Sequence, residues 1–217
     1  MLGKAIRDTG MRRLWALTVY HAVNDGSIAV FMATLPAITM ALDLTYYQVG
    51  VVLSLGSVTY LILQLVFGYL SDRGLTNTVI LIGFIGVIFS AVLFPFASVF
   101  VQILAAYLLI RTFTSVYHPV GFASISRIYA KYRTKAFGIQ GVGEQIAMVI
   151  TPIFTGFIAE AYGWRTPFYI WAAAGLVGFM FFLILFKSGR MNFGNDNTNP
   201  SVKAVSYTHL TLPTKRI

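Results

Sequence analysis

The feature that most constrains the fold of this chain is a series of six long apolar stretches. They cover residues 14–40, 46–70, 77–95, 99–126, 135–159 and 165–186. A helix needs roughly 20 apolar residues to cross a bilayer, and only helices or closed barrels can do so. The stretches lack the short alternating pattern of barrel strands. The sequence therefore predicts an all-α membrane protein, a bundle of six transmembrane helices.

Composition and charge agree with this class. Hydrophobic residues make up 57% of the chain and charged residues 11%, against about 25% charged residues in soluble domains. Cysteine is absent, which excludes disulfides and thiolate metal sites. The net charge of +9 indicates contact with anionic membrane lipid. It does not indicate a nucleic-acid partner, because no basic stripe with exposed aromatic residues lies outside the apolar stretches.

Basic residues gather on one side of the predicted bundle. They precede the first stretch, follow the last, or lie in the second and fourth connections: Lys4, Arg7, Arg12, Arg13, Arg73, Arg127, Lys131, Arg133, Lys135, Lys187 and Arg190. The opposite side carries only Arg165. The positive-inside rule then places both termini in the cytoplasm. We expect a multi-pass protein of the bacterial inner (plasma) membrane.

The chain divides into three parts by composition. Residues 1–190 form the membrane unit, and residues 191–204 are polar, as in a flexible cytoplasmic linker. Residues 205–217 (VSYTHLTLPTKRI) resemble the translated read-through of a sequencing adapter. We expect this segment to be a non-native tail that packs against nothing, with the natural chain continuing beyond residue 204. The alternative is a genuine short tail.

Three charged residues inside the apolar stretches point to function. Asp25, Arg111 and Glu144 lie in the first, fourth and fifth stretches. Ionisable groups at bilayer depth are costly, and they usually face a polar cavity on the path of a substrate or proton. These residues therefore indicate transport.

The first stretch carries His21, Asn24 and Asp25 at spacings that place them on one helix face. Asp25 would lie about 16 Å into the membrane from Leu14, close to the bilayer midplane. The alternative is a turn at residues 24–26 that breaks the stretch into two pieces. Each piece would have only about a dozen residues, too few to span a bilayer.

The fourth stretch carries a second polar stripe, composed of Tyr107, Arg111, Thr114, Ser115 and His118. The proline at position 119 lacks a backbone N–H, so a bend or hinge is expected beside it. Structural roles are the alternatives here: the arginine would only neutralise a carboxylate, and the histidine would only bind a backbone carbonyl.

The fifth stretch shows two patterns. Gln140 and Glu144 share one face, and small residues recur beside them at intervals of four: Gly143, Ala147, Thr151, Thr155 and Ala159. Such small-residue ridges let helices pack closely in membranes, so the ridge indicates packing. The second stretch offers a milder polar stripe: Ser57, Tyr60, Gln64 and Gly68. The third and sixth stretches carry no charge in their centres and are expected to face lipid.

The polar stretches should converge on one cavity that holds two carboxylates and one guanidinium. One guanidinium cannot keep two buried acids ionised, so one of them is expected to bind and release a proton. Asp25, Glu144 and Arg111 are the proposed proton-coupling residues. The residues expected to contact a small-molecule substrate are His21, Asn24, Gln64, Tyr107, His118 and Gln140.

At this point the motifs show a family resemblance. Gly68–Arg73 resembles the cytoplasmic loop signature of the major facilitator superfamily, although Leu75 and Thr76 replace its later Gly and Arg. The arginine of the fourth stretch matches the superfamily's membrane arginine. The fifth stretch keeps the spacing of the superfamily's antiporter signature, with several glycines replaced by other small residues: Gly138, Ala147, Thr151, Pro152, Thr155 and Gly156.

Two shorter motifs resemble the fosmidomycin-resistance-like branch of that superfamily. His21–Asp25 (HAVND) and Tyr117–Gly121 (YHPVG) are similar to its H-x-x-N-D and F-H-P segments. Val120 departs from the acid that some members carry after the proline. The resemblance covers roughly residues 10–190.

The resemblance implies a twelve-helix transporter built from two six-helix halves, of which this chain holds the N-terminal one. Gly68, Asp72 and Arg73 would belong to a gating loop, with Asp72 contacting the missing C-terminal half. The implied function is proton-coupled, antiport-type efflux of a small organic compound. The alternatives are a metabolite uptake symporter and a non-transporting scaffold or inert fragment. No cofactor, metal site or enzyme activity is expected, because the stretches hold two histidines and no cysteine.

Overall fold

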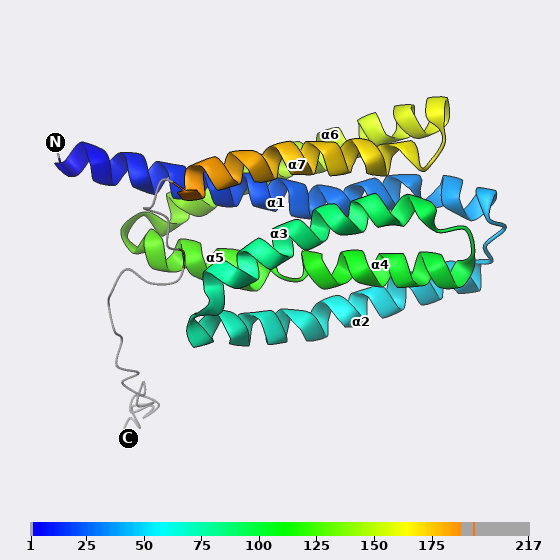
Figure 1. The fold of residues 1–217 in the computed structure, drawn as a ribbon, viewed down its shortest axis with the longest axis horizontal. Coiled ribbons are helices and arrows are strands. Elements are labelled where there is room, and N and C mark those ends of the chain that lie inside the picture. Colours follow the sequence, from blue (N-terminus) through cyan, green and yellow to red (C-terminus); the bar gives the residue numbers. More distant parts are fainter. Residues whose placement is uncertain (1, 188–192, 194–217) are drawn as a thin grey trace, which may run out of the picture.

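The computed structural model describes residues 2–187 and 193 and is helical along most of their length (Figure 1). The predicted linker and tail lie outside these residues, apart from Phe193. The described elements are α1 (Leu2–Ala41), α2 (Tyr46–Leu70), η1 (Ser71–Leu75), α3 (Thr76–Leu93), η2 (Phe94–Phe96), α4 (Phe100–Thr114), α5 (Tyr117–Ile128), η3 (Ala130–Tyr132), α6 (Arg133–Tyr162) and α7 (Thr166–Lys187). The described residues contain no strand.

Five helical runs of the described residues are long and apolar enough to cross a membrane. They are Gly10–Ala41, Tyr46–Phe96, Phe100–Ile128, Ala130–Tyr162 and Thr166–Phe186. The prediction of an all-helical chain with membrane-crossing helices is confirmed. The number of runs differs from six because the second and third predicted stretches are joined through η1 into one run of 51 residues.

The long run Tyr46–Phe96 reverses direction within η1. Gly74 there has a φ of 88° and a ψ of 4°, a left-handed conformation that glycine adopts without steric cost. Figure 1 shows α2 and α3 running back in opposite directions from this turn. A positive φ at one glycine therefore produces two antiparallel helices from one continuous helical run.

The predicted bend in the fourth stretch is present. α4 ends at Thr114 and α5 begins at Tyr117, two residues before Pro119. A proline cannot donate a backbone hydrogen bond, so the helix cannot continue regularly through this point. The break separates α4 from α5 (Figure 1), and His118 lies in the first turn of α5.

α1 lies at the centre of the packing. It contacts α6 and α7 along much of its length, while α3 packs against α4 and α7, and α2 against α4 and α5. Aromatic contacts join these helices: the Tyr20 and Phe84 rings stack at 4.6 Å, and those of Phe31 and Tyr107 at 4.0 Å. Buried aromatic side chains contribute most of the area that such a core removes from its surroundings.

α6 approaches α1 closely at one of the predicted small residues. A Cβ added to Gly143 would lie 2.4 Å from the Thr18 side chain of α1. Thr151 and Thr155, further along the same ridge, are buried, and Ala147 is half-buried. Pro152 lies inside the helix and is half-buried. The absence of a side chain at position 143 thus allows this contact between α1 and α6.

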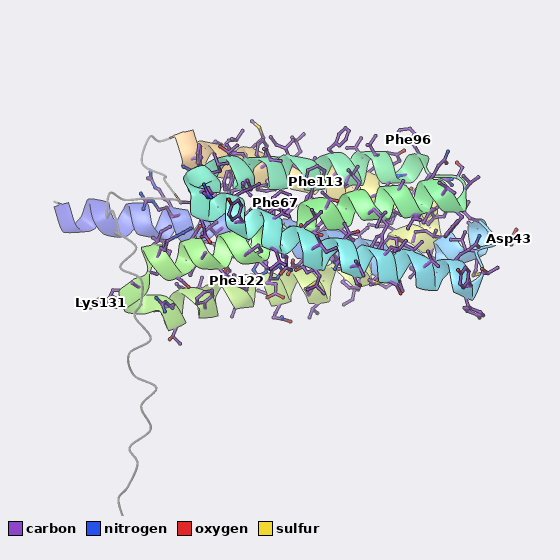
Figure 2. All side chains as sticks on the ribbon, turned by 90° about the horizontal axis from the view of Figure 1, so that it is seen from below. Asp43, Phe67, Phe96, Phe113, Phe122 and Lys131 are labelled. Carbon is purple, nitrogen blue, oxygen red and sulfur yellow. The ribbon has the colours of Figure 1, made fainter. Side chains whose placement is uncertain are left out.

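The outer surface of the bundle is apolar along its length (Figure 2). Leu65 on α2, Phe157 on α6 and Val177 on α7 are 76%, 70% and 72% exposed. An exposed apolar surface of this extent suits a bilayer. Asp43 and Lys131, in the connections after α1 and after α5, lie at opposite ends of the bundle (Figure 2).

Candidate functional site

α1 presents His21, Asn24 and Asp25 together, as their spacing predicts. The helix is continuous from Leu2 to Ala41, so the alternative of a turn at residues 24–26 is wrong. Nε2 of His21 lies 3.1 Å from Oδ2 of Asp25, and Nδ2 of Asn24 donates to Oδ1 at 2.7 Å. His21 and Asn24 are each 1% exposed. The Asp25 carboxylate is therefore held by side chains of its own helix.

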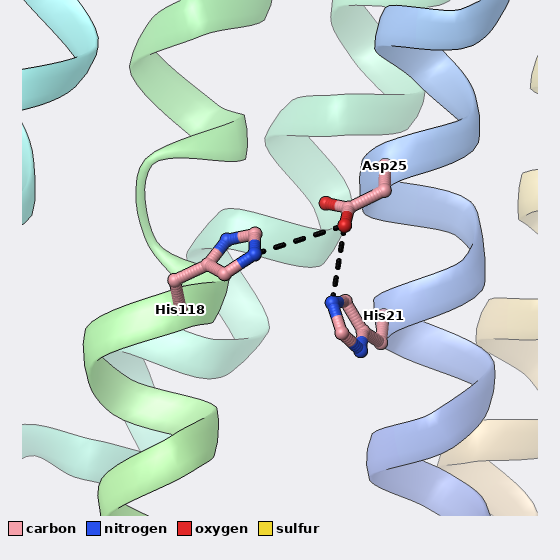
Figure 3. Close-up of side chains that lie close together, drawn as sticks. All are labelled: His21, Asp25 and His118. Carbon is pink, nitrogen blue, oxygen red and sulfur yellow. Dashed lines mark ion pairs between the residues drawn. The ribbon is translucent and has the colours of Figure 1, made fainter. Parts of the chain in front are cut away.

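α5 brings a second histidine to the same carboxylate. Nε2 of His118 lies 3.7 Å from Oδ2 of Asp25 (Figure 3), and its Nδ1 is hydrogen-bonded to the Tyr60 hydroxyl of α2 at 3.0 Å. His118 is half-buried, directly after the break between α4 and α5. One carboxylate oxygen thus lies between two imidazole rings that come from different helices.

Arg111 of α4 is positioned by α2 and not by an acid. Its Nε donates to the Gly56 carbonyl at 3.3 Å, and its guanidinium lies 4.1 Å from the centre of the Tyr60 ring. Among the described residues, the ion pairs of Asp25 are with its two histidines, and Arg111 forms none. The expected pairing of Arg111 with a buried carboxylate is therefore not seen, because α2 offers the guanidinium a carbonyl and an aromatic face.

Gly56 makes this α2–α4 contact possible. A Cβ added there would lie 2.2 Å from the Tyr107 ring and 3.1 Å from Cγ of Arg111. Tyr107, expected to contact substrate, is instead 2% exposed and stacked on Phe31 of α1. Its position is that of a core residue.

α6 contributes to the site through Gln140 and Glu144. Gln140 is buried and donates from Nε2 to the Tyr117 hydroxyl, and the Tyr117 ring stacks on His21 at 4.3 Å. Glu144 is half-buried, and its Oε1 accepts a hydrogen bond from Gln145 at 3.2 Å. Gln140 thus reaches the histidine and aspartate through an aromatic ring, whereas Glu144 makes no ion pair among the described residues.

The remaining predicted residues lie further from Asp25. Gln64 is half-buried on α2, one turn beyond Tyr60. In η1, the exposed Asp72 lies 4.0 Å from the Arg127 guanidinium of α5, and the Arg73 guanidinium lies 4.9 Å from the Tyr69 ring. Gly68 accepts a backbone hydrogen bond at the end of α2. The Asp72–Arg127 contact joins η1 to the C-terminal end of α5, away from the buried carboxylate.

Sequence reasoning missed two aromatic residues that support the site. Tyr60 contacts both His118 and Arg111, and Trp171 of α7 donates from Nε1 to the Ser27 hydroxyl at 2.9 Å. The Trp171 ring lies against Gly26, next to Asp25. Nothing in an apolar stretch distinguishes such aromatic residues from lipid-facing ones. Of these two residues, only Tyr60 had a sequence signal, because it belongs to the polar stripe of the second stretch.

The site can hold a proton or a cation. The ligand atoms of His21, Asp25 and His118 lie within 4.8 Å of one another, and they form the only such group among the described residues. The carboxylate and the two imidazoles are groups of the kinds that bind protons or metal ions. The sequence analysis expected no metal site because the chain has few histidines. It could not show that two of those histidines lie beside the same aspartate.

Comparison with known proteins gives one family match. The model of the Major Facilitator Superfamily matches residues 17–211. An uncharacterized MFS-type transporter of Bacillus subtilis, YfnC, is 22% identical over 194 residues, which cover 89% of this chain and 47% of that protein. The fosmidomycin resistance protein of Escherichia coli is 27% identical over 151 residues, 69% of this chain and 37% of that protein.

A solved structure shares the fold. The crystal structure of a bacterial homologue of the human lysosomal transporter Spinster, inward-facing and unoccupied, superposes with a TM-score of 0.71 at 18% identity. The match covers 90% of this chain and 47% of that one. The chain spans less than half the length of the curated relatives it matches.

Proposed function

The chain belongs to the major facilitator superfamily, and on this basis we propose that it is one half of a proton-coupled secondary transporter. α1, α2, α3, the α4–α5 pair, α6 and α7 would be its six spans, with residues 1–190 as the N-terminal half. The reversal at Gly74 supports this reading, since it makes two antiparallel helices of the 51-residue run. The missing C-terminal half would supply the other six spans.

The observation that carries the proposal is the placement of Asp25. It lies about 16 Å along α1 from Leu14, near mid-depth, with two imidazoles on one of its oxygens. A carboxylate at bilayer depth is energetically costly, and carboxylates found there usually lie on the path of a proton or substrate. Asp25 is thus the proposed proton carrier. Glu144, half-buried on α6, is proposed as the second acid of the path.

Arg111 would act on this site through space. Its guanidinium and His118 share Tyr60 as a contact, so the positive charge lies one side chain away from the histidine and aspartate. The half-buried His118 and Gln64 would contact substrate directly. The buried His21, Asn24 and Gln140 would position these groups, and the buried Tyr107 would support the α2–α4 contact at Gly56.

We propose that the transporter exports a small organic compound from the cell. The similarity to the fosmidomycin resistance protein supports it, together with the antiporter-like spacing on α6. The transporter would lie in the bacterial inner membrane with both termini in the cytoplasm. This orientation follows from the basic residues on one side of the bundle.

The test is proton movement coupled to substrate. A full-length transporter that carries residues 1–187 as its N-terminal half is expressed in cells, and everted vesicles are loaded with a pH-sensitive dye. Addition of fosmidomycin, or of other small organic compounds in a panel, should release protons from vesicles that hold a pH gradient. No proton release with any compound that the same vesicles transport would contradict coupling.

A further inference from the structure

We propose that His21, Asp25 and His118 form a binding site for a single divalent transition-metal ion of the Zn²⁺, Co²⁺ or Ni²⁺ class. This goes beyond proton-coupled transport, since it assigns the same three side chains a second ligand. Nε2 of each histidine and Oδ2 of the aspartate are the ligand atoms (Figure 3).

The spacing of these atoms fits a metal ion. Zinc lies about 2.0–2.1 Å from an imidazole nitrogen or a carboxylate oxygen, so neighbouring ligands in a tetrahedral site lie roughly 3.4 Å apart. The two nitrogen-to-oxygen distances are 3.1 Å and 3.7 Å. All three ligand atoms lie within 4.8 Å of one another. Small side-chain rotations would bring the two nitrogens to metal-binding distance, with no change in the backbone.

Contacts outside the three ligands leave the ligand atoms free. Asn24 occupies Oδ1 of Asp25 and leaves Oδ2 between the two rings. The Tyr60 hydroxyl contacts Nδ1 of His118, which turns Nε2 toward the carboxylate. Metal-binding histidines characteristically use their second nitrogen in such a hydrogen bond, which fixes the tautomer and orientation of the ring.

His21 gives an independent observation. It is 1% exposed, its Nε2 lies 3.1 Å from Oδ2 of Asp25, and its Nδ1 has no hydrogen-bond partner among the described residues. The stacked ring of Tyr117 holds His21 with Nε2 toward Asp25. A metal ion between them would take the place of this direct contact between Nε2 and the carboxylate.

The ligand set selects the class of ion. Two imidazoles and one carboxylate suit zinc, cobalt and nickel, whereas magnesium and calcium prefer sites made of oxygen atoms. Three protein ligands leave a fourth position for water or for a ligating group of a transported compound.

The experiment measures metal binding by the purified 217-residue chain, without a polyhistidine tag, in detergent or lipid nanodiscs. Zn²⁺ is titrated by calorimetry and Co²⁺ by visible absorption. We expect one ion per chain. His21→Ala, His118→Ala and Asp25→Asn should each weaken binding by more than Tyr60→Phe, which removes only the hydroxyl that contacts Nδ1 of His118. That variant should lose about 10–100-fold in affinity.

Matched controls separate the site from other groups. His209→Ala removes the remaining histidine of the sequence, and Glu160→Gln removes an exposed acid of α6. Both should bind like the unaltered chain. Tyr60→Phe removes one oxygen atom, so it reports on the site even if an alanine variant fails to fold.

No binding of either metal, or unchanged binding in the His21→Ala/His118→Ala double variant, would overturn the proposal. Loss of binding in His209→Ala alone would do the same. The assay involves no transport, so failure here leaves proton coupling to be judged on its own test.

Discussion

Asp25 of α1 and His118 of α5 lie 3.7 Å apart across the bundle, from Oδ2 to Nε2. The break between α4 and α5 places His118 in the first turn of a separate helix. The contact therefore depends on the angle between α1 and α5 as well as on two side chains. A change in that angle would alter the partners of the carboxylate, which is how a helix break can be linked to proton binding.

The packing of α7 on α1 gives a first prediction. A Cβ added to Gly26 would lie 2.2 Å from the Trp171 ring. Gly26→Ala should therefore destabilise the folded chain by about 1–3 kcal/mol, the usual cost of overpacking. The measurement is the free energy of unfolding in mixed detergent micelles. Gly50→Ala is the matched control, since nothing lies near Gly50. It should stabilise α2 by up to about 1 kcal/mol, and equal destabilisation by both variants would contradict the account.

A second prediction concerns the hydrogen bonds of Trp171. Its Nε1 donates to the Ser27 hydroxyl and lies 3.3 Å from the Val23 carbonyl. Trp171→Phe keeps an aromatic ring but removes this donor, so it should lower the free energy of unfolding by about 1 kcal/mol or more.

The control for this variant is Trp15→Phe on the same bundle. Trp15 is 49% exposed, and its replacement should change the free energy of unfolding by less than about 0.5 kcal/mol. A smaller effect at Trp171 than at Trp15 would show that the donor does not hold α1 to α7.

The contacts of Arg111 give a third prediction. Its Nε donates to the Gly56 carbonyl while the planar guanidinium covers Tyr60. Lysine keeps the charge but cannot reproduce both contacts, because it lacks the planar group. In the full-length transporter, Arg111→Lys should retain more transport than Arg111→Ala and less than the unaltered protein. Initial rates in vesicles measure this order, and full activity of Arg111→Ala would rule out a role for the charge.

The exposed pair Asp72–Arg127 gives a fourth prediction. The Arg127 and Asp72 side chains are 42% and 76% exposed, so their ion pair contributes little to the stability of the chain alone. Asp72→Asn should therefore leave unfolding of the 217-residue chain unchanged while it slows transport by the full-length protein, where Asp72 is proposed to contact the other half. A clear loss of stability in the isolated chain would assign Asp72 a local structural role instead.

The sequence predicted those parts of the fold that depend on local chemistry. Spacing placed His21, Asn24 and Asp25 on one face of α1, and Pro119 indicated the break before α5. The contact of Arg111 with Tyr60 could not be predicted in this way. It depends on how closely α2 approaches α4 at Gly56, and one sequence does not specify the rotation of two helices about their axes.

The partners of the predicted charged residues could not be predicted for the same reason. One guanidinium and two acids suggested a shared ion pair, but the imidazoles of His21 and His118 are the partners of Asp25. Counting acids against arginines leaves out histidine as a partner for an acid, and it leaves out aromatic faces and backbone carbonyls as partners for arginine. The sequence singled out these residues, whereas their pairing depends on how α1, α2, α4 and α5 pack.

The most direct test of proton coupling at Asp25 compares two modes of transport in proteoliposomes. Asp25→Asn in the full-length transporter should abolish transport driven by a pH gradient and retain exchange of labelled for unlabelled compound without a gradient. Glu144→Gln, measured in parallel, shows whether the second acid is also required. Full gradient-driven transport by Asp25→Asn would contradict the account.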